Sequence, residues 1–261
     1  MSGARRWAFL DLPTPHAFAH RGGATPGVEN AVSQFADVER LGYTYVETDV
    51  RTTADGVAVL FHDEDAGRVT GRAGPLSGLR WADVQALAYG NGEPVARLDD
   101  VLDAFPRLRF NIDLKDEGGV RSVPDVVART GSGRRVCVTS FSQRRVERAR
   151  RHLGPEVCTG LGVGGVARLV GTGVSGSRRG RRAGGAGVLQ VPWVLPLARR
   201  LPGILVRLAQ REGLAVHVWT VDDPAEMVAA LDLGVDGLMT DQPVLLRQVL
   251  QRRGQWSGPP G

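Results

Sequence analysis

The sequence predicts an α/β fold: a single (β/α)8 TIM barrel with a small hairpin insertion after the second strand. Three observations support this prediction. Strand-like and helical segments alternate along the chain, as a parallel sheet with connecting helices requires. The chain has 261 residues, and such a barrel takes about 250. Polar residues follow the strand-like runs, where a parallel barrel carries its functional side chains.

Short runs rich in Val, Ile, Leu and Phe predict nine strands. They span 17–20, 44–50, 57–61, 109–114, 136–141, 157–161, 188–191, 214–221 and 237–240. Only residues 51–56, with an Ala-Asp-Gly turn, separate the second run from the third, whereas a parallel crossover needs about a dozen residues or more. The third run is therefore expected to return antiparallel as a hairpin, which leaves eight parallel strands.

Helical apolar spacing predicts helices between most of these strands. The segments are 31–41, 81–87, 98–104, 142–151, 201–210 and 224–233. Several end at a glycine, such as Gly42 and Gly234, as helices commonly do.

One barrel domain is expected over 15–251, with tails at 1–14 and 252–261. The Gly- and Arg-rich run 171–187 interrupts the alternation and is expected to be a flexible surface loop. The same run, with its arginines at 178–182, is the feature that would favour contact with anionic lipid or nucleic acid.

The composition is that of a globular protein and excludes several classes. With 42% hydrophobic residues and 35 Gly without a fixed period, the chain is neither collagen-like nor disordered overall. No apolar run approaches the ~18 residues of a membrane span, and no signal peptide is visible, so a cytosolic location is expected. Cys137 and Cys158 fit no metal-ligand spacing and are expected in the core. The net charge of +5 is compatible with nucleic acid, anionic membrane or a phosphorylated substrate.

Three carboxylates lie at the ends of two consecutive barrel strands. Glu47 and Asp49 are two residues apart on one strand, and Asp113 is two residues from both Asn111 and Lys115 on the next. Residues two apart share a face of a strand, so we expect these side chains to converge at the barrel mouth. Without Cys or His at ligand spacing, such an oxygen-rich group favours Mg2+ or Ca2+ over zinc.

Cationic and titratable side chains accompany the carboxylates. Arg21 and Lys115 are placed to bind the oxygens of a phosphate group. Lys115 is the single lysine of the chain, and a compact ammonium fits between carboxylates where a planar guanidinium does not. His20 and His62, each at a strand end, have the pKa that is suited to acid and base catalysis of phosphodiester cleavage.

Taken in order, these motifs resemble the glycerophosphodiester phosphodiesterase family, within the PLC-like phosphodiesterase superfamily. The series is His-Arg-Gly, Glu-Asn, Glu-x-Asp-Val, His-Asp, Asn-Ile-Asp-Leu-Lys, His-Val-Trp-Thr-Val and Gly-Val-Asp-Gly-Leu-Met-Thr-Asp-x-Pro, from about 17 to 250. The resemblance implies a metal-dependent barrel enzyme that hydrolyses glycerophosphodiesters to glycerol 3-phosphate and an alcohol.

The resemblance also implies functions for individual residues. His20 and His62 match the acid/base pair, and Glu47, Asp49 and Asp113 match the ligands of a divalent ion. Arg21 and Lys115 match positions near the phosphate, and Trp219 matches an aromatic residue at the mouth. His20 is assigned first as the base, although the sequence leaves the two histidines interchangeable. The nucleophile is either water or the glycerol 2-hydroxyl.

The chain departs from the family pattern at three positions. Asp113 stands where the family commonly has Glu, which shortens the ligand arm by one methylene. Val28 and Ala31 replace the Pro and Thr of the family's Pro-Glu-Asn-Thr element. His217 has no catalytic position in the family pattern and is expected to be a packing residue.

Two alternatives stay open on the sequence. The first is phospholipase D-type hydrolysis of lysophospholipids or sphingomyelin at the same site, which the apolar segment 192–208 favours. The second is a catalytically inactive barrel that binds through its basic surface. The basic residues are spread over many helices, so nucleic acid is not expected as a partner, and a weak contact with an anionic membrane is left open.

Overall fold

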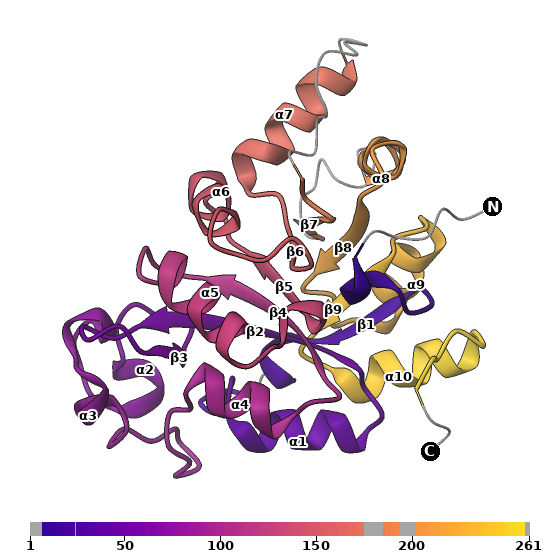
Figure 1. The fold of residues 1–261 in the computed structure, drawn as a ribbon. Coiled ribbons are helices and arrows are strands. Elements are labelled where there is room, and N and C mark those ends of the chain that lie inside the picture. The colour runs from indigo at the N-terminus through magenta and orange to yellow at the C-terminus, as the bar shows by residue number, and fades with distance from the viewer. Residues whose placement is uncertain (1–6, 24, 175–184, 194–201, 259–261) are drawn as a thin grey trace.

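The computed structural model describes residues 7–23, 25–174, 185–193 and 202–258. Among these residues eight parallel strands form a nearly closed barrel with helices around it (Figure 1). The strands are β1 (His16–Ala19), β2 (Tyr45–Thr52), β4 (Arg109–Leu114), β5 (Val136–Thr139), β6 (Cys158–Thr159), β7 (Val188–Pro192), β8 (Ala215–Trp219) and β9 (Gly237–Thr240). The predicted barrel is thereby confirmed.

The strands follow the order β6-β5-β4-β2-β1-β9-β8-β7, with every neighbouring pair in this order parallel. The ring closes between β6 and β7 through an isolated parallel bridge between Gly160 and Val188 and a bond from Leu161 N to Val188 O of 3.1 Å. This closure is short because β6 has only two residues.

The main helices cover the outside of the strands. They are α1 (Val32–Arg40), α4 (Leu98–Ala104), α5 (Gly119–Arg129), α6 (Gln143–Arg150), α7 (Val163–Val174), α8 (Pro202–Arg211), α9 (Pro224–Asp232) and α10 (Pro243–Arg252). Asp223 caps α9 by accepting bonds from Ala225 N and Glu226 N, and Pro224 occupies its first turn. The sequence did not predict α5, α7 or α10.

The insertion between β2 and β4 is larger than the predicted hairpin. The hairpin itself is present, because β3 (Ala58–Leu60) pairs antiparallel with β2. The chain then adds the short helices α2 (Gly67–Thr70) and α3 (Trp81–Val84) before α4. Buried side chains such as Phe61, Leu76 and Tyr89 form a separate apolar cluster under this insertion.

The N-terminal segment closes the barrel at the end opposite the predicted site. Trp7, Phe9 and Leu10 pack with interior residues of the strands, including Phe18 and Tyr45. The Tyr45 hydroxyl donates a hydrogen bond of 2.7 Å to Phe9 O. The expectation of a tail over residues 1–14 is therefore wrong for Trp7 to Leu10, because burial of large apolar side chains holds this segment in place.

Polar and sulfur-containing side chains complete the barrel interior. Cys137 and Cys158 are free and buried, as expected. His217 is also buried, with Nε2 lying 3.4 Å from His16 Nδ1, which agrees with the expected packing position.

The structure also changes the expectation for the flexible loop at 171–187. Helix α7 continues to Val174, and residues 185–187 lead directly into β7, so these parts are ordered. Residues 175–184, with the arginine cluster, lie outside the described residues, as do residues 194–201 of the predicted apolar segment. Within the described part of the chain, no helix is both long enough and apolar enough to cross a membrane.

Candidate active site

A tight turn at the end of β1 presents the first two site residues. Arg21 has a φ of 50°, and Gly22 follows with a φ of 82°. A Cβ atom at Gly22 would lie 2.8 Å from Gln34 Cβ, so both the backbone conformation and the approach of α1 require glycine here. The His-Arg-Gly motif therefore aims its two functional side chains from the carboxyl end of the first strand.

His20 lies between two carboxylates. Its Nδ1 is 2.6 Å from Asp241 Oδ1, and its Nε2 is 3.7 Å from Glu47 Oε2. Burial by itself lowers the pKa of His20, but the charges of Glu47 and Asp241 outweigh burial and raise the pKa above its usual value. The aspartate fixes the ring through Nδ1 and leaves Nε2 facing the mouth.

Strand register brings the predicted metal ligands together. Asp49 on β2 lies directly beside Asp113 on β4. Lys115 Nζ bridges them, at 2.8 Å from Asp49 Oδ1 and 2.7 Å from Asp113 Oδ2. Arg21 Nε forms a further ion pair of 3.1 Å with Asp49 Oδ2. The single lysine of the chain therefore lies between two carboxylates, as its sequence position suggested.

The three carboxyl groups differ in electrostatic environment. Although burial opposes it, the cations Lys115 and Arg21 lower the pKa of Asp49. Burial, together with the charge of Asp49, raises the pKa of Glu47 to about 7. Burial also raises the pKa of Asp113. Buried acids with raised pKa values and cationic neighbours are typical of functional sites.

Two residues of the loop before α1 support the carboxylates. Asn30, at a φ of 67°, donates from Nδ2 to Asp49 Oδ2 at 3.1 Å and accepts from Thr48 Oγ1 at 2.8 Å. Glu29 is buried and forms ion pairs with Arg21 and Arg68. The loop therefore keeps its Glu-Asn pair in contact with the site, despite Val28 and Ala31 on either side.

His62 reaches the same end of the barrel from the hairpin. Phe61 N donates to Asp49 O at 2.9 Å, which fixes the end of β3 beside the site. His62 Nδ1 lies 2.6 Å from Asp63 Oδ1, and Arg68 pairs with that aspartate. The charge of His62 contributes to the lowered pKa of Asp49, so this histidine lies within electrostatic range of the cluster.

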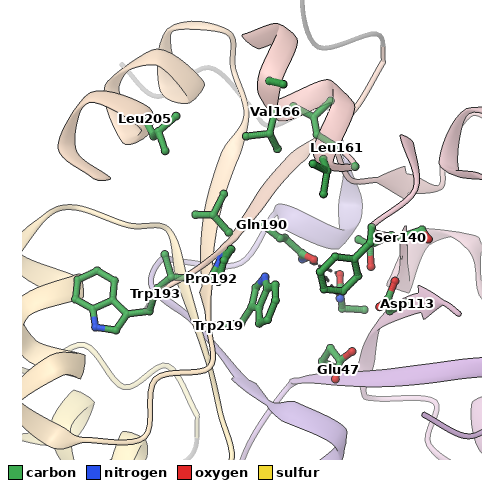
Figure 2. A pocket seen from close by; sticks show the side chains of 18 residues that line it. Glu47, Asp113, Ser140, Leu161, Val166, Gln190, Pro192, Trp193, Leu205 and Trp219 are labelled. Carbon is green, nitrogen blue, oxygen red and sulfur yellow. Dashed lines mark hydrogen bonds between the residues drawn. The ribbon is translucent and has the colours of Figure 1, made fainter. Parts of the chain in front are cut away.

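Trp219 lines a cavity of about 440 Å3 that opens beside the carboxylates (Figure 2). Its ring contacts Phe141 edge to face, with centroids 5.5 Å apart. Lys115 Nζ lies 5.6 Å from the centre of the Phe141 ring, which connects the aromatic pair to the charged cluster. Glu47 and Asp113 line the same cavity, so Trp219 is at the mouth as expected.

A model of the glycerophosphoryl diester phosphodiesterase family matches residues 20–245. The chain belongs to this family. Among its relatives, a probable glycerophosphodiester phosphodiesterase of Mycobacterium tuberculosis is 37% identical over 259 residues, which cover 98% of each chain. The family resemblance carried by the sequence motifs is thereby confirmed.

Solved structures of the family share the barrel. One is a putative glycerophosphoryl diester phosphodiesterase from Silicibacter pomeroyi, with a TM-score of 0.77, 22% identity and coverage of 97% of this chain and 99% of that one. Another is an Oleispira antarctica phosphodiesterase in complex with the product sn-glycerol 3-phosphate, with a TM-score of 0.74, 19% identity and coverage of 91% and 97%. At these identities the likeness establishes the fold of the family in this chain.

Four residues of the quoted motifs have contacts in the site although the sequence assigned them no function there. Asp241 and Asp63 each lie within hydrogen-bond distance of a histidine Nδ1. Asn30 bonds to Asp49, and Glu29 pairs with Arg21. Asp241 follows the last barrel strand directly, so the strand-end rule that selected the other residues could have assigned it to the site.

The family is generally dependent on a divalent metal ion, and the residues of this chain fit one. Glu47, Asp49 and Asp113 offer oxygen ligands only, which suits Mg2+ or Ca2+. Asp113 Oδ1 is buried, and within the described part of the chain it has no hydrogen-bond partner. A cation would satisfy this oxygen.

The carboxylates are not preassembled around a single point. Among the described residues no three acidic, histidine or cysteine side chains form a ready metal cluster. Lys115 Nζ instead lies between Asp49 and Asp113. A metal ion would therefore compete with the Lys115 ammonium for the same carboxylate oxygens.

Proposed function

We propose that this protein hydrolyses glycerophosphodiesters to glycerol 3-phosphate and an alcohol. The observation that carries the proposal is a repeated contact at one barrel mouth: His20 and His62 each place Nδ1 2.6 Å from an aspartate oxygen. Such a contact fixes the ring and leaves Nε2 as the proton-transferring atom. Membership of the phosphodiesterase family supports the assignment of this pair to phosphodiester cleavage.

The two histidines supply the proton transfers that hydrolysis requires. One imidazole accepts the proton of the attacking hydroxyl as a new bond forms between its oxygen and phosphorus. The other donates a proton to the leaving oxygen as the second phosphorus–oxygen bond breaks. Asp241 and Asp63 orient the rings and stabilise the charge that each ring carries during transfer.

Lys115 and Arg21 bind and orient the phosphate. The Lys115 ammonium has three donors, of which two point at Asp49 and Asp113. The third remains for a phosphate oxygen. The Arg21 guanidinium forms an ion pair with Asp49 through Nε, and its terminal N–H groups are further donors for a phosphate oxygen. These fixed charges offset the negative charge of the diester as it reacts.

Glu47, Asp49 and Asp113 are the residues that we propose hold the divalent ion, Mg2+ or Ca2+. When bound, such an ion withdraws charge from a phosphate oxygen as a Lewis acid. Burial, together with the charge of Asp49, raises the pKa of Glu47 to about 7, and a bound cation would favour the ionised carboxylate.

Phosphorus NMR of the products tests this proposal and distinguishes the two nucleophiles. With glycerophosphocholine and Mg2+ or Ca2+, we expect glycerol 3-phosphate and choline, and no turnover after chelation of the metal. Attack by the glycerol 2-hydroxyl gives a cyclic phosphate before glycerol 3-phosphate, whereas attack by water gives glycerol 3-phosphate directly. If neither glycerol 3-phosphate nor the cyclic phosphate forms, with Mg2+ or with Ca2+, the proposal is contradicted.

The partner that we propose is a small glycerophosphodiester, and the process is the turnover of lipid-derived diesters. The cytosolic location and a weak contact with anionic membrane stay predictions of the sequence. The arginine cluster that motivated the membrane contact lies outside the described residues.

A further inference from the structure

The cavity beside the carboxylates is polar at one end and apolar at the other. Glu47 and Asp113 lie at one end, and Leu161, Val166 and Leu205 lie on the far side, with Trp219 and Gln190 between them (Figure 2). We call the apolar part the apolar arm, defined by Phe141, Leu161, Val163, Val166, Val191 and Leu205. A charged group of a ligand fits the first end, and hydrocarbon fits the arm.

The apolar arm lies beside the junction of β6 and β7, where the barrel is joined by very few strand contacts. Strand β6 has two residues and meets β7 through one isolated bridge, Gly160 to Val188. Helices α7 and α8 follow these strands in the chain and contact each other. Apolar side chains from α7, including Val166, and from α8, including Leu205, form the outer wall. The cavity is therefore built into the fold between strand ends and helices.

The rim of the arm carries apolar side chains that face solvent. Val163 is 64% exposed and Phe141 is 56% exposed, the two most exposed of the large hydrophobic residues in the described part of the chain. Val163 N donates to Phe141 O at 3.0 Å, so the two belong to one edge. Exposed apolar residues at the entrance of an apolar cavity are typical of a site that receives an apolar ligand.

We propose that the apolar arm binds one long acyl or alkyl chain of the phosphodiester substrate. This inference rests on the proposed function, because it places the phosphate at the carboxylates and cations. The volume of about 440 Å3 is shared by the polar end and the apolar arm. It lies within the ~300–1,000 Å3 of typical ligand pockets, so the cavity has room for a phosphate group with hydrocarbon beside it.

The chain can be attached on either side of the phosphate. In a lysophospholipid it is carried by the glycerol, and in a glycerol 3-phosphate ester of a fatty alcohol it is carried by the leaving group. Both diesters react in the same way. The oxygen of water or of the glycerol 2-hydroxyl gives up its proton and bonds to phosphorus, the bond to the leaving oxygen breaks, and the leaving oxygen takes a proton; a cyclic phosphate formed by the 2-hydroxyl is then opened by water. Both present hydrocarbon beside the phosphate, which is the chemistry that the arm recognises.

Two substrate series at monomeric concentrations test the inference. The first is lysophosphatidylcholine with acyl chains of six to sixteen carbons, the second is glycerol 3-phosphate joined to alcohols of the same lengths, and glycerophosphocholine is the reference without a chain. We expect kcat/KM to rise about two- to fourfold for each added methylene in at least one series until the arm is full. The series in which kcat/KM rises shows whether the hydrocarbon chain is attached to the glycerol or to the leaving group. Values independent of length in both series would overturn the inference.

Val163→Asp is the variant that tests the arm itself, and Val244→Asp is its matched control. Both valines are exposed, at 64% and 49%, and both lie in the first turn of a helix, where an acidic residue is tolerated. Val244 is not among the residues that line the cavity. We expect Val163→Asp to lower the ratio of kcat/KM for a twelve-carbon substrate over glycerophosphocholine about tenfold. Val244→Asp should leave this ratio unchanged, and equal ratios in both variants would overturn the inference.

Calorimetric binding of dodecyl phosphate separates a failure of this inference from a failure of the proposed function. If no diester is turned over, glycerophosphocholine included, the proposed function fails. The arm is then still tested, because dodecyl phosphate should bind at least tenfold more weakly to Val163→Asp than to Val244→Asp. Equal affinities for the two variants would overturn the inference by themselves.

Discussion

His20 Nδ1 and Asp241 Oδ1 lie 2.6 Å apart and join the end of the first barrel strand to the end of the last. Strands β1 and β9 are neighbours in the ring, with Ala19 paired to Thr240. Thr240 Oγ1 and Asp241 N both donate hydrogen bonds to Asp222 Oδ1, at 2.9 and 2.7 Å. These two bonds fix the position of Asp241. Barrel closure therefore sets the orientation of a proposed catalytic imidazole.

Asp241→Asn should lower kcat by about 100-fold or more, because the amide stabilises the protonated ring less and permits the other tautomer. Asp232→Asn is the control, since Asp232 lies on the surface at the end of α9 and pairs with Arg253. Steady-state turnover of glycerophosphocholine measures both. A similar kcat for the two variants would show that Asp241 does not act through His20.

Lys115→Arg should lower kcat/KM by about 10- to 100-fold. The ammonium lies within 2.8 Å of both Asp49 and Asp113, and a planar guanidinium cannot occupy that point without displacing one of them. Arg107→Lys is a control for the exchange of the two cation types, because Arg107 is exposed and pairs with Glu39 outside the cluster. Wild-type kcat/KM in Lys115→Arg would mean that only the charge at this position matters.

Asp113→Glu should lower the metal concentration that gives half-maximal activity by about tenfold. The longer side chain brings the unpaired carboxylate oxygen of this position closer to Glu47 and Asp49. Metal titrations of the wild type and the variant with Mg2+ and with Ca2+ measure the change. Identical titration curves would show that residue 113 does not bind the ion.

Asp99→Asn should lower stability at neutral pH by about 1 kcal/mol, after allowance for solvent screening. Hydrogen bonds, first from Arg97 and also from Arg129, lower the pKa of Asp99 to about 2. Because the folded pKa lies below the unfolded value of about 3.9, this stabilisation is present above about pH 4 and is lost as the pH falls towards 2.

Urea unfolding of Asp99→Asn and the wild type at pH 7, 5, 4 and 3 measures this stability difference. Asp100→Asn is the control, because Asp100 lies in the same helical turn but is mostly exposed. The difference should shrink between pH 4 and 3 for Asp99→Asn only. If the difference in the free energy of unfolding between Asp99→Asn and the wild type does not change with pH, the loss of stability does not come from the charge of Asp99.

The strands were predictable because each is a short apolar run bounded by turns, and all nine runs correspond to strands. The helices were less predictable than the strands. Helix α5 begins beside Gly118 and Gly119 and contains Pro124, signals that argue against a helix. Burial of Val120, Val123 and Val126 against the barrel outweighs them. The glycines of α7 conceal that helix in the same way.

The site was predictable where strand spacing alone fixes it. Glu47 and Asp49 share a face, and strand register then places Asp49 beside Asp113. The contacts of His20 with Asp241 and of Asp49 with Asn30 join positions 221 and 19 residues apart. Such contacts depend on ring closure and on a loop conformation, which strand periodicity does not specify.

The most direct test of the proposed function compares kcat for glycerophosphocholine in the wild type, His20→Ala and His62→Ala, with metal present and with folding verified by circular dichroism. Each substitution removes one of the two proton-transferring groups, and general acid or base catalysis contributes about 10²- to 10⁴-fold. We therefore expect kcat to fall at least 100-fold in each variant. Undiminished turnover in either folded variant would contradict the assignment of the two histidines as the acid/base pair.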